Sequence, residues 1–357
     1  MTDFYIGQHC NHPDHGAGTL TFIGSDYVGI ELQEGSQVLV RKETFLKPSS
    51  PIGVQRLVSS ERASSWPEST FVRDDAEAQH YHGSHWQPFF DDVKMILEQL
   101  PVILKSAEPW VGGSNMHAIR ETPSGWTPGI TLVWPNHRQG LMLSIETSSD
   151  RNSLISMHPF VSVGGQHHVR LLQVNVWENG LEAQIEVEFG ETTLTFFDVA
   201  YTKNRLWYEA GRSFQFIISG IAYDARPSTL METPVNHHPD EIAWQRQLGE
   251  IEGKAIPPLS STISLRGMAM FLHIEEWDRD DYSFRGPIKE VRELNLDILG
   301  QTGWFVKVTA MRFNGGDADL DFLITQRVWQ GTTPPSVGQD IEGSVWLQGY
   351  LWCPPTW

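Results

Sequence analysis

Apolar and polar residues alternate in short runs over residues 1–60 of the chain. Residues 20–23, 27–32 and 37–41 are rich in β-branched, aromatic and leucine side chains, as strands are. The runs are separated by the tripeptides Gly-Ser-Asp and Glu-Gly-Ser, which have the composition of turns. The pattern predicts a small β-barrel of short strands in this region.

The order of these elements is similar to that of a known class of small domain. The segment begins with His15-Gly-Ala-Gly-Thr-Leu, continues through a hairpin and ends with Phe45-Leu-Lys-Pro. It resembles the Tudor-like or KOW-like SH3 barrels that are attached to larger nucleic-acid enzymes. Such barrels bind proteins as often as nucleic acids, so the resemblance implies a binding module and does not specify its ligand.

Residues 61–110 have a different composition, rich in Ser, Glu, Asp and His, and contain one predicted helix over 88–100. Pro88 suits the first helical position, Asp91 and Asp92 suit the first turn, and Pro101 is expected to end or kink the helix. The segment is predicted to be a linker with one amphipathic helix. The apolar residues at helical spacing are Phe89, Phe90, Val93, Ile96, Leu97 and Leu100.

A set of residues recurs 127 positions further along the chain, within two regions of similar strand and turn pattern. We therefore predict two copies of one β-domain, at 111–228 and 263–357, joined by a linker at 229–262. Chance matches in a glycine-rich β sequence are the alternative. The recurring pairs are Gly140 and Gly267, Gly211 and Gly338, Phe214 and Ile341, and Tyr223 and Tyr350.

The predicted fold class is mainly β: an SH3-like barrel, one linker helix, and two related OB-like or sandwich β-domains. Each copy contains five or six predicted strands, which suits a small Greek-key barrel of the OB type or a compact sandwich. Hydrophobic periodicity does not separate these two architectures, because both alternate inward and outward residues along every strand.

Composition narrows the class of protein. The 357 residues include 39 aromatic side chains, so the chain is expected to fold, and no apolar run is long enough to span a bilayer. No secretory signal is recognised at the start, and Cys10 and Cys353 form no paired motif, so we expect a cytoplasmic protein without a disulfide framework. The formal net charge is −18, of which −8 lies in residues 229–357, and no segment is basic. This distribution argues against duplex nucleic-acid binding through phosphates.

The histidine-rich run His80-Tyr-His82-Gly-Ser-His85 is the sharpest local motif. It resembles the HxHxDH signature of metallo-β-lactamase-fold hydrolases, with Ser84 at the place of the aspartate and without the preceding apolar strand. The resemblance implies a metal-dependent hydrolase with zinc on His80, His82 and His85. A structural or adventitious zinc ion and a solvated linker are the alternatives. The standard nucleophile, phosphate-loop and kinase motifs are absent, which favours a non-enzymatic protein without a cofactor.

Two further groups of titratable residues are predicted to be exposed. His167 and His168 form a pair without a visible partner and are expected in a loop. Asp317, Asp319 and Asp321 follow a hairpin turn and are expected to alternate on the exposed face of a strand. An EF-hand is excluded there, because its required glycine and glutamate positions hold other residues.

The acidic run between residues 275 and 281 can hold a divalent cation or present a negative face to a basic partner. Together with nearby tryptophans it forms the predicted partner-binding set: Glu275, Glu276, Trp277, Asp278, Asp280, Asp281, Trp304, Trp329 and Trp346. The leading hypothesis is a non-enzymatic accessory, inhibitor or immunity-type protein that binds a protein partner with a basic surface. The alternatives are a single-stranded nucleic-acid-binding protein of the OB type and the metal-dependent hydrolase.

Overall fold

The computed structural model describes residues 9–12, 16–23, 27–32, 37–41, 69–72, 85–92, 94–110, 126–177, 179–208, 211–236, 260–296 and 301–353. Strands dominate these residues and the helices are short, so the prediction of a mainly β protein is confirmed. None of the described helices has both the length and the apolar character needed to cross a membrane.

The first four strands form an antiparallel sheet in which each strand pairs with the next one along the chain. The strands are β1 (His9–His12), β2 (Gly16–Ile23), β3 (Tyr27–Leu32) and β4 (Gln37–Arg41). The SH3-like barrel stays a prediction, because the connections and residues 42–60 lie outside the described residues.

The predicted helix over 88–100 is replaced by two shorter helices, α2 (Lys94–Leu97) and α3 (Leu100–Ser106). Pro101 does not end a helix but lies in the first turn of α3, where its missing N–H has no helical partner to lose. Of the apolar residues predicted at helical spacing, Phe89 and Ile96 are buried, and Phe90 and Leu100 are half-buried against the same core. Leu97 is 48% exposed, and Val93 lies outside the described residues. Trp86 and Ile103, which the periodicity does not include, are also buried.

Ten strands form one continuous hydrogen-bonded assembly. In chain order they are β5 (Ser69–Val72), β10 (Gly165–Trp177), β11 (Ala183–Phe189), β12 (Thr192–Asp198), β13 (Ser213–Pro227), β16 (Met270–His273), β17 (Asp281–Leu296), β18 (Gln301–Phe313), β19 (Gly316–Thr325) and β20 (Asp340–Cys353).

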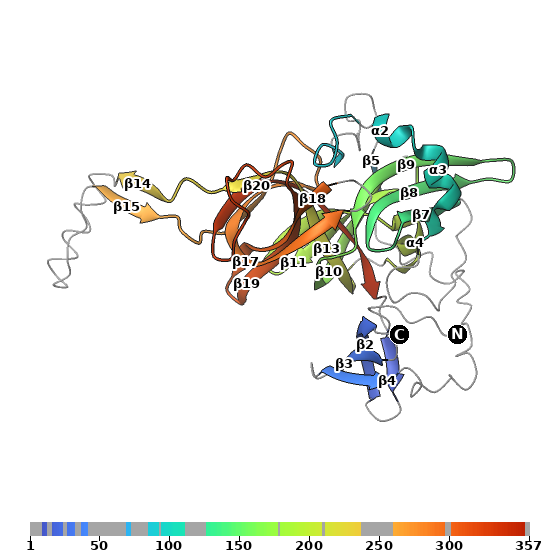
Figure 1. The fold of residues 1–357 in the computed structure, drawn as a ribbon, viewed down its shortest axis with the longest axis horizontal. Coiled ribbons are helices and arrows are strands. Elements are labelled where there is room, and N and C mark those ends of the chain that lie inside the picture. Colours follow the sequence, from blue (N-terminus) through green and yellow to red (C-terminus); the bar gives the residue numbers. More distant parts are fainter. Residues whose placement is uncertain are drawn as a thin grey trace.

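This assembly closes into two barrels that share two strands (Figure 1). The first barrel runs β10, β11, β12, β20, β13 and closes because β13 also pairs with β10. The second barrel runs β17, β18, β19, β13, β20 and closes because β20 also pairs with β17. The long strands β13 and β20 therefore belong to both barrels.

The two barrels use corresponding contacts around the shared pair. Gly211, just before β13, donates its N–H to the carbonyl of Leu171 at 2.8 Å, and Gly338, just before β20, donates its N–H to the carbonyl of Ile288 at 2.8 Å. Both glycines have left-handed backbone angles, with φ values of 77° and 82°. These two positions are 127 residues apart, so the spacing noticed in the sequence marks equivalent turns in the structure.

A separate antiparallel sheet contains β6 (Glu108–Pro109), β7 (Gly129–Pro135), β8 (Gln139–Thr147) and β9 (Asn152–Val161). Gly140 lies in this sheet, whereas Gly267 lies in a turn before β16, so these two glycines are not equivalent. The remaining elements are α4 (Tyr201–Asn204), a 3-10 turn η3 (Arg205–Trp207), and the paired strands β14 (Glu232–Asn236) and β15 (Ser260–Ser264).

Two apolar clusters form the core, and alternation along the shared strands separates them. Phe214, Phe216 and Ile218 of β13 belong to a cluster that continues through both barrels. Ile217 and Ile221 point to the opposite face and join a second cluster with the β6–β9 sheet and the short helices. The back of the shared strand pair is thus covered, which makes the residues on that face interior ones.

Candidate functional site

The acidic run predicted to bind a partner forms a compact loop between β16 and β17. The N–H of Ile274 donates to the carbonyl of Asp281 at 3.1 Å, the N–H of Trp277 to the carbonyl of Ile274 at 3.0 Å, and the N–H of Asp281 to the carbonyl of Asp278 at 2.9 Å. These short-range bonds fold the segment into successive turns. We call residues 274–281 the acidic loop.

Two carboxylates of the acidic loop point inward and hold it in place. Asp280 accepts hydrogen bonds from Trp346 Nε1 at 3.0 Å and from Gln184 Nε2 at 2.8 Å, while Asp281 accepts one from the Tyr223 hydroxyl at 2.7 Å. Asp280, Asp281 and Trp346 are all buried. Burial, and then the neighbouring Asp281 carboxylate, raise the pKa of Tyr223 well above its usual value, so its hydroxyl remains a donor.

The outer part of the acidic loop is at the surface. Trp277 is 48% exposed, and its ring lies edge-on to the Tyr223 ring with centroids 5.5 Å apart. Glu275 and Glu276 are exposed and Asp278 is half-buried. The loop therefore presents one large aromatic side chain with acidic neighbours on a framework of buried hydrogen bonds.

The other predicted aromatic residues lie elsewhere. Trp304 is buried and packs edge-to-face against the half-buried Trp329, with centroids 6.2 Å apart, in the core that runs through the barrels. Trp346 belongs to the other core cluster. The predicted set is thus divided among two cores and one loop, and only the loop residues Glu275, Glu276 and Trp277 are well exposed.

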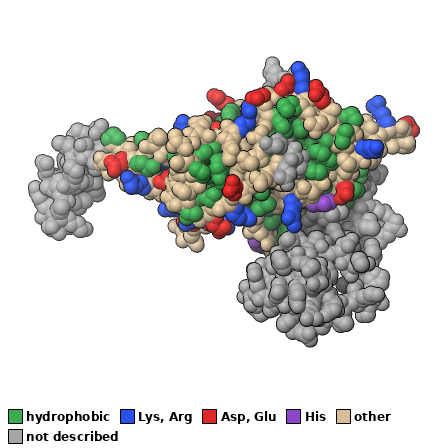
Figure 2. Space-filling model, viewed as in Figure 1, with side chains coloured by type: hydrophobic (Ala, Val, Ile, Leu, Met, Phe, Trp, Pro, Cys, Tyr) green, Lys and Arg blue, Asp and Glu red, His purple; other side chains and the backbone are tan. Residues whose placement is uncertain are grey.

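Figure 2 shows how charged side chains are distributed on one face of the molecule. Acidic and basic side chains are interspersed there, and no single broad acidic field is visible. The acidic excess of the sequence is therefore not gathered into one patch on this face.

The structure brings the end of the histidine-rich motif close to the acidic loop. His85 is buried, and its ring stacks on Trp346 with centroids 3.8 Å apart and an interplanar angle of 7°. The motif residues His80 and His82 lie outside the described residues. The hydrolase hypothesis that uses all three histidines therefore stays a prediction.

Metal-binding geometry in the described part of the chain is found in the acidic loop itself. One carboxylate oxygen each from Asp278, Asp280 and Asp281 lies within 4.8 Å of the others, and His85 is not part of that group. An all-oxygen set favours a hard cation such as Mg²⁺ or Ca²⁺ over zinc. Two of these carboxylates already accept the hydrogen bonds that hold the loop, which explains their proximity without an ion.

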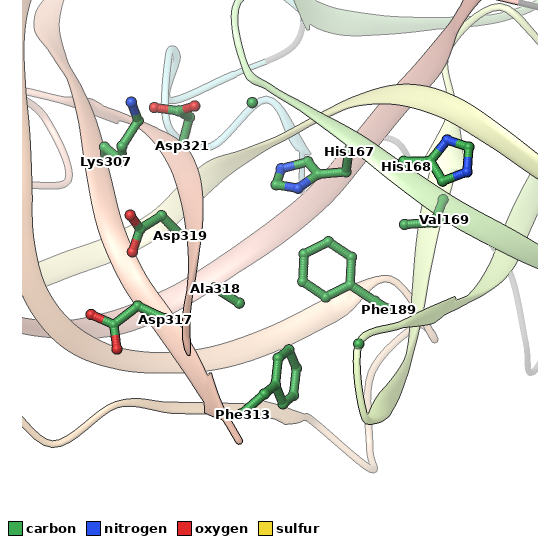
Figure 3. Close-up of a pocket in the computed structure, with 12 residues that line it drawn as sticks. His167, His168, Val169, Phe189, Lys307, Phe313, Asp317, Ala318, Asp319 and Asp321 are labelled. Carbon is green, nitrogen blue, oxygen red and sulfur yellow. The ribbon is translucent and has the colours of Figure 1, made fainter. Parts of the chain in front are cut away.

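A second candidate site lies between the barrels (Figure 3). Residues 213–218 of β13 pair with β10, and residues 219–221 pair with β19, so a groove of about 460 Å³ forms where β10 and β19 diverge. We call it the acidic groove. Its walls are Gly165, His167, His168, Val169, Phe189, Gly190, Lys307, Phe313, Asp317, Ala318, Asp319 and Asp321.

Most charges of the acidic groove have partners. Asp317 accepts a hydrogen bond from Lys289 Nζ at 3.0 Å, and Asp319 accepts one from Thr309 Oγ1 at 2.8 Å. Lys307 Nζ donates to a carboxylate oxygen of Glu290 at 2.7 Å. The groove keeps its negative character, because its three carboxylates outnumber its one lysine.

Asp321 differs from these residues. Its side chain is only 5% exposed, and no hydrogen bond or ion pair joins its carboxylate to a described residue. Burial raises the pKa of Asp321, while the more distant charges of Lys307 and Arg292 act in the opposite direction. A buried carboxylate without a direct partner is energetically costly and is a feature of ligand sites.

His167 faces the same groove. Its Nε2 atom is buried and has no hydrogen-bond partner among the described residues. Burial lowers the pKa of His167 to about 4, although the carboxylate of Asp319 acts to raise it. The imidazole is consequently neutral near pH 7, so it offers one donor and one acceptor and does not neutralise the nearby acids.

The sequence prediction for these residues needs correction. His167 and His168 lie in β10 and not in a loop, and Asp321 is buried where the alternation of β19 predicted exposure. The outward face of β19 is covered in part because β10 of the other barrel lies beside it. The alternation itself was a usable signal, since it places Asp317, Asp319 and Asp321 on one face.

A second groove lies at the corresponding place on the other edge of the shared strands. β20 pairs with β17 up to Trp346 and with β12 from Gln348, and a groove of about 470 Å³ forms where β12 and β17 diverge. The Tyr282 hydroxyl spans it, accepting the N–H of Thr195 at 2.8 Å and donating to its carbonyl at 3.2 Å. We call this the bridged groove.

Comparison of the chain with protein-family models, with curated proteins and with solved structures gives no match. The function proposed below therefore depends on the geometry of this protein alone.

Proposed function

We propose that the protein binds another protein that carries a basic surface, and that the acidic loop is the contact. The observation that carries this proposal is the exposed Trp277 on a loop fixed by buried hydrogen bonds. Tryptophan is enriched among the residues that dominate interface energies, and a loop that is already ordered loses little entropy on binding.

The charges of the acidic loop define the kind of partner. Glu275 and Glu276 are exposed and directly precede Trp277 in the chain, Asp278 is half-buried, and Arg279 is the one exposed cation of the loop. Arginine and lysine side chains of a partner can pair with these carboxylates around an aromatic centre. Such rim charges mainly accelerate association and lose influence as salt is added.

The proposal includes two OB-type barrels produced by duplication. In the first barrel, β10, β11, β12 and β13 are strands 1 to 4, and β20 supplies strand 5. The cyclic order is 1-2-3-5-4, with a parallel contact between strands 3 and 5, as expected for an OB-type barrel. The second barrel repeats this order with β13 as its strand 5, which supports an exchange of the last strands between two copies.

A partner is first captured at low salt and purified. The test itself is a titration of the purified partner with the purified protein, in which the binding affinity is measured. Trp277→Ala is expected to weaken binding by roughly 30-fold, the effect of losing a central aromatic contact. Val337→Ala is the matched control, because Val337 is also an exposed apolar residue but lies in another loop. Equal affinity of the two variants would refute the proposed contact.

The nucleic-acid alternative is separated by a second titration. The chain is mixed with labelled single-stranded oligonucleotides at low salt, and fluorescence anisotropy is measured. We expect no saturable increase, because the described loop and groove surfaces are acidic. A saturable increase that Trp277→Ala leaves unchanged would favour the OB-type nucleic-acid hypothesis over the protein-binding one.

A further inference from the structure

We propose that the acidic groove accepts the guanidinium group of an arginine side chain from the protein partner. This inference rests on the proposed function, because it assigns a second, more specific contact to the same basic partner. The groove lies between the two barrels, with β10 on one wall and β19 on the other (Figure 3).

The unpaired Asp321 carboxylate is the first reason. It lines the groove, it is nine-tenths buried, and no described residue donates a hydrogen bond to it. An ionised carboxylate that is largely shielded from water is stabilised by a cation or by several donors. A ligand that brings a cation and several N–H groups together supplies what this carboxylate lacks.

The one lysine of the groove, Lys307, acts on Asp321 through its charge, but no hydrogen bond or ion pair joins the two side chains. Lys307 is held by Glu290 at 2.7 Å. Asp317 is paired with Lys289 at 3.0 Å and with Arg312 at 3.4 Å, so those cations are also engaged. No described side chain forms a direct ion pair with Asp321, so a bound cation would be its first direct partner.

His167 and the adjacent rings favour guanidinium over a simple ammonium. The buried Nε2 of His167 is a further group without a partner, and the His167 ring lies 5.0 Å from the ring of Phe189. Phe313 is on the same side, 6.4 Å from Phe189. A guanidinium group is planar, lies well on aromatic faces and donates in several directions at once, whereas an ammonium is a compact point charge.

Gly165 lies beside both His167 and Asp321. A methyl group added at Gly165 would lie 2.7 Å from His167 Nε2 and 3.5 Å from Asp321 Oδ2. The glycine therefore lets the His167 ring lie close to the backbone beside Asp321. Any other residue would push its Cβ against this ring and displace it from the wall of the groove.

The full-length protein is titrated with Nα-acetyl-arginine amide while the imidazole resonances of His167 are followed by NMR. We expect a saturable shift, and no saturable shift with Nα-acetyl-citrulline amide, which has the same shape without the charge. Asp321→Asn is expected to reduce the affinity for the arginine probe at least tenfold, and Val337→Ala to leave it unchanged. Equal shifts with both probes, unchanged affinity of Asp321→Asn, or no saturable shift would each overturn the inference.

A second variant keeps the test decisive if Asp321→Asn does not fold. Gly165→Ala fills the space beside His167 Nε2 and is expected to reduce arginine-probe affinity at least tenfold; retained affinity would overturn the inference. Titration of the purified partner then separates the two proposals. Loss of partner binding in Trp277→Ala but not in Asp321→Asn would overturn the arginine contact alone. Arginine-probe binding together with full partner binding by Trp277→Ala would overturn the acidic-loop contact alone.

Discussion

The acidic groove and the bridged groove have nearly the same size and the same backbone surroundings but different chemistry. Strand pairing relates the two grooves position by position. Gly165 pairs with Ile218 of β13, and Tyr282 pairs with Val345 of β20, which lies 127 residues after Ile218. Gly165 and Tyr282 therefore occupy corresponding positions. By the same correspondence His167 matches Phe284. One groove has a hydrogen-bonded bridge across it, while the other leaves polar groups without partners.

Asp321 of the acidic groove also has a neutral counterpart. Asp321 pairs with Ser219 on β13, and the matching place on β12 is occupied by Thr195, whose backbone groups bond Tyr282. The bridged groove has the tyrosine bridge and a threonine at this place, although Glu186, His273 and Arg279 also line it. The comparison teaches that the unpaired groups are not required by the architecture, which supports a binding role for them.

Opening the bridged groove is expected to have the largest effect. Tyr282→Gly removes both hydrogen bonds to Thr195 and the stacked contact with Phe271, whose ring centroid lies 4.4 Å away. We expect a loss of about 4 kcal/mol in unfolding free energy, measured by urea denaturation. Leu272→Ala, at an exposed neighbouring position, is the control. A loss below about 1 kcal/mol would show that the bridge does not stabilise this groove.

The second prediction concerns acid and the acidic groove. Folding lowers the pKa of His167 from 6.5 to about 4. Between these two pH values the imidazole is protonated in the unfolded chain and neutral in the folded chain. The folded state is therefore penalised as pH falls from 6.5 toward 4, by up to roughly 3 kcal/mol. His167→Phe, which copies Phe284, is expected to remove this penalty. Asp319, Asp321 and Lys307 face the ring and remain in both proteins.

Urea unfolding at pH 7, 5.5 and 4 measures the effect. The difference in stability between His167→Phe and the wild type should grow steadily over that range. His168→Phe is the matched control, because His168 is the exposed neighbour in the same strand. If both variants follow the wild-type pH dependence, the burial of His167 has no energetic consequence and the contrast between the grooves is weakened.

Local features of this comparison could be predicted from the sequence. The sequence predicts a hairpin turn over residues 314–317, and the turn is present at Asn314 and Gly315, since Phe313 and Gly316 already pair across it. The spacing between Gly211 and Gly338 marks two equivalent turns, because a left-handed backbone position favours glycine strongly enough to be visible in a sequence. Both features depend on residues that are close together along the chain.

The grooves and the interior side of the acidic loop could not be predicted in that way. Alternation shows that Asp319 and Asp321 share a face, but the strand that covers Asp321 is more than 140 residues away in sequence. Likewise, Trp277 and Trp346 are the same residue type, and one is exposed while the other is fully buried. Only the pairing of distant strands decides between these environments.

The third prediction is a gain in stability. Asp321→Asn removes the charge of a buried group that lacks a direct partner, and we expect an increase of roughly 2 kcal/mol in unfolding free energy at pH 7. Folding raises the pKa of Asp321, so the penalty is absent below pH 3.8 and grows as the pH rises. The gain should therefore be small at pH 3.5. Asp317→Asn, at an ion-paired position of the same strand, should give no gain. A loss of stability in Asp321→Asn would mean that the carboxylate is already satisfied.

The smallest effect tests the correspondence on which the comparison of grooves depends. Gly211→Ala and Gly338→Ala place a methyl group in open space at left-handed backbone positions, so the cost comes from the backbone alone. We expect each to lower the unfolding free energy by about 1 kcal/mol and by nearly equal amounts. Gly315→Ala, which also has open space but no such backbone angle, should change it by less than about 0.5 kcal/mol. Unequal losses of unfolding free energy at Gly211 and Gly338 would show that the two turns do not contribute equally to stability. The two grooves could then no longer be compared as equivalent positions of the same backbone arrangement.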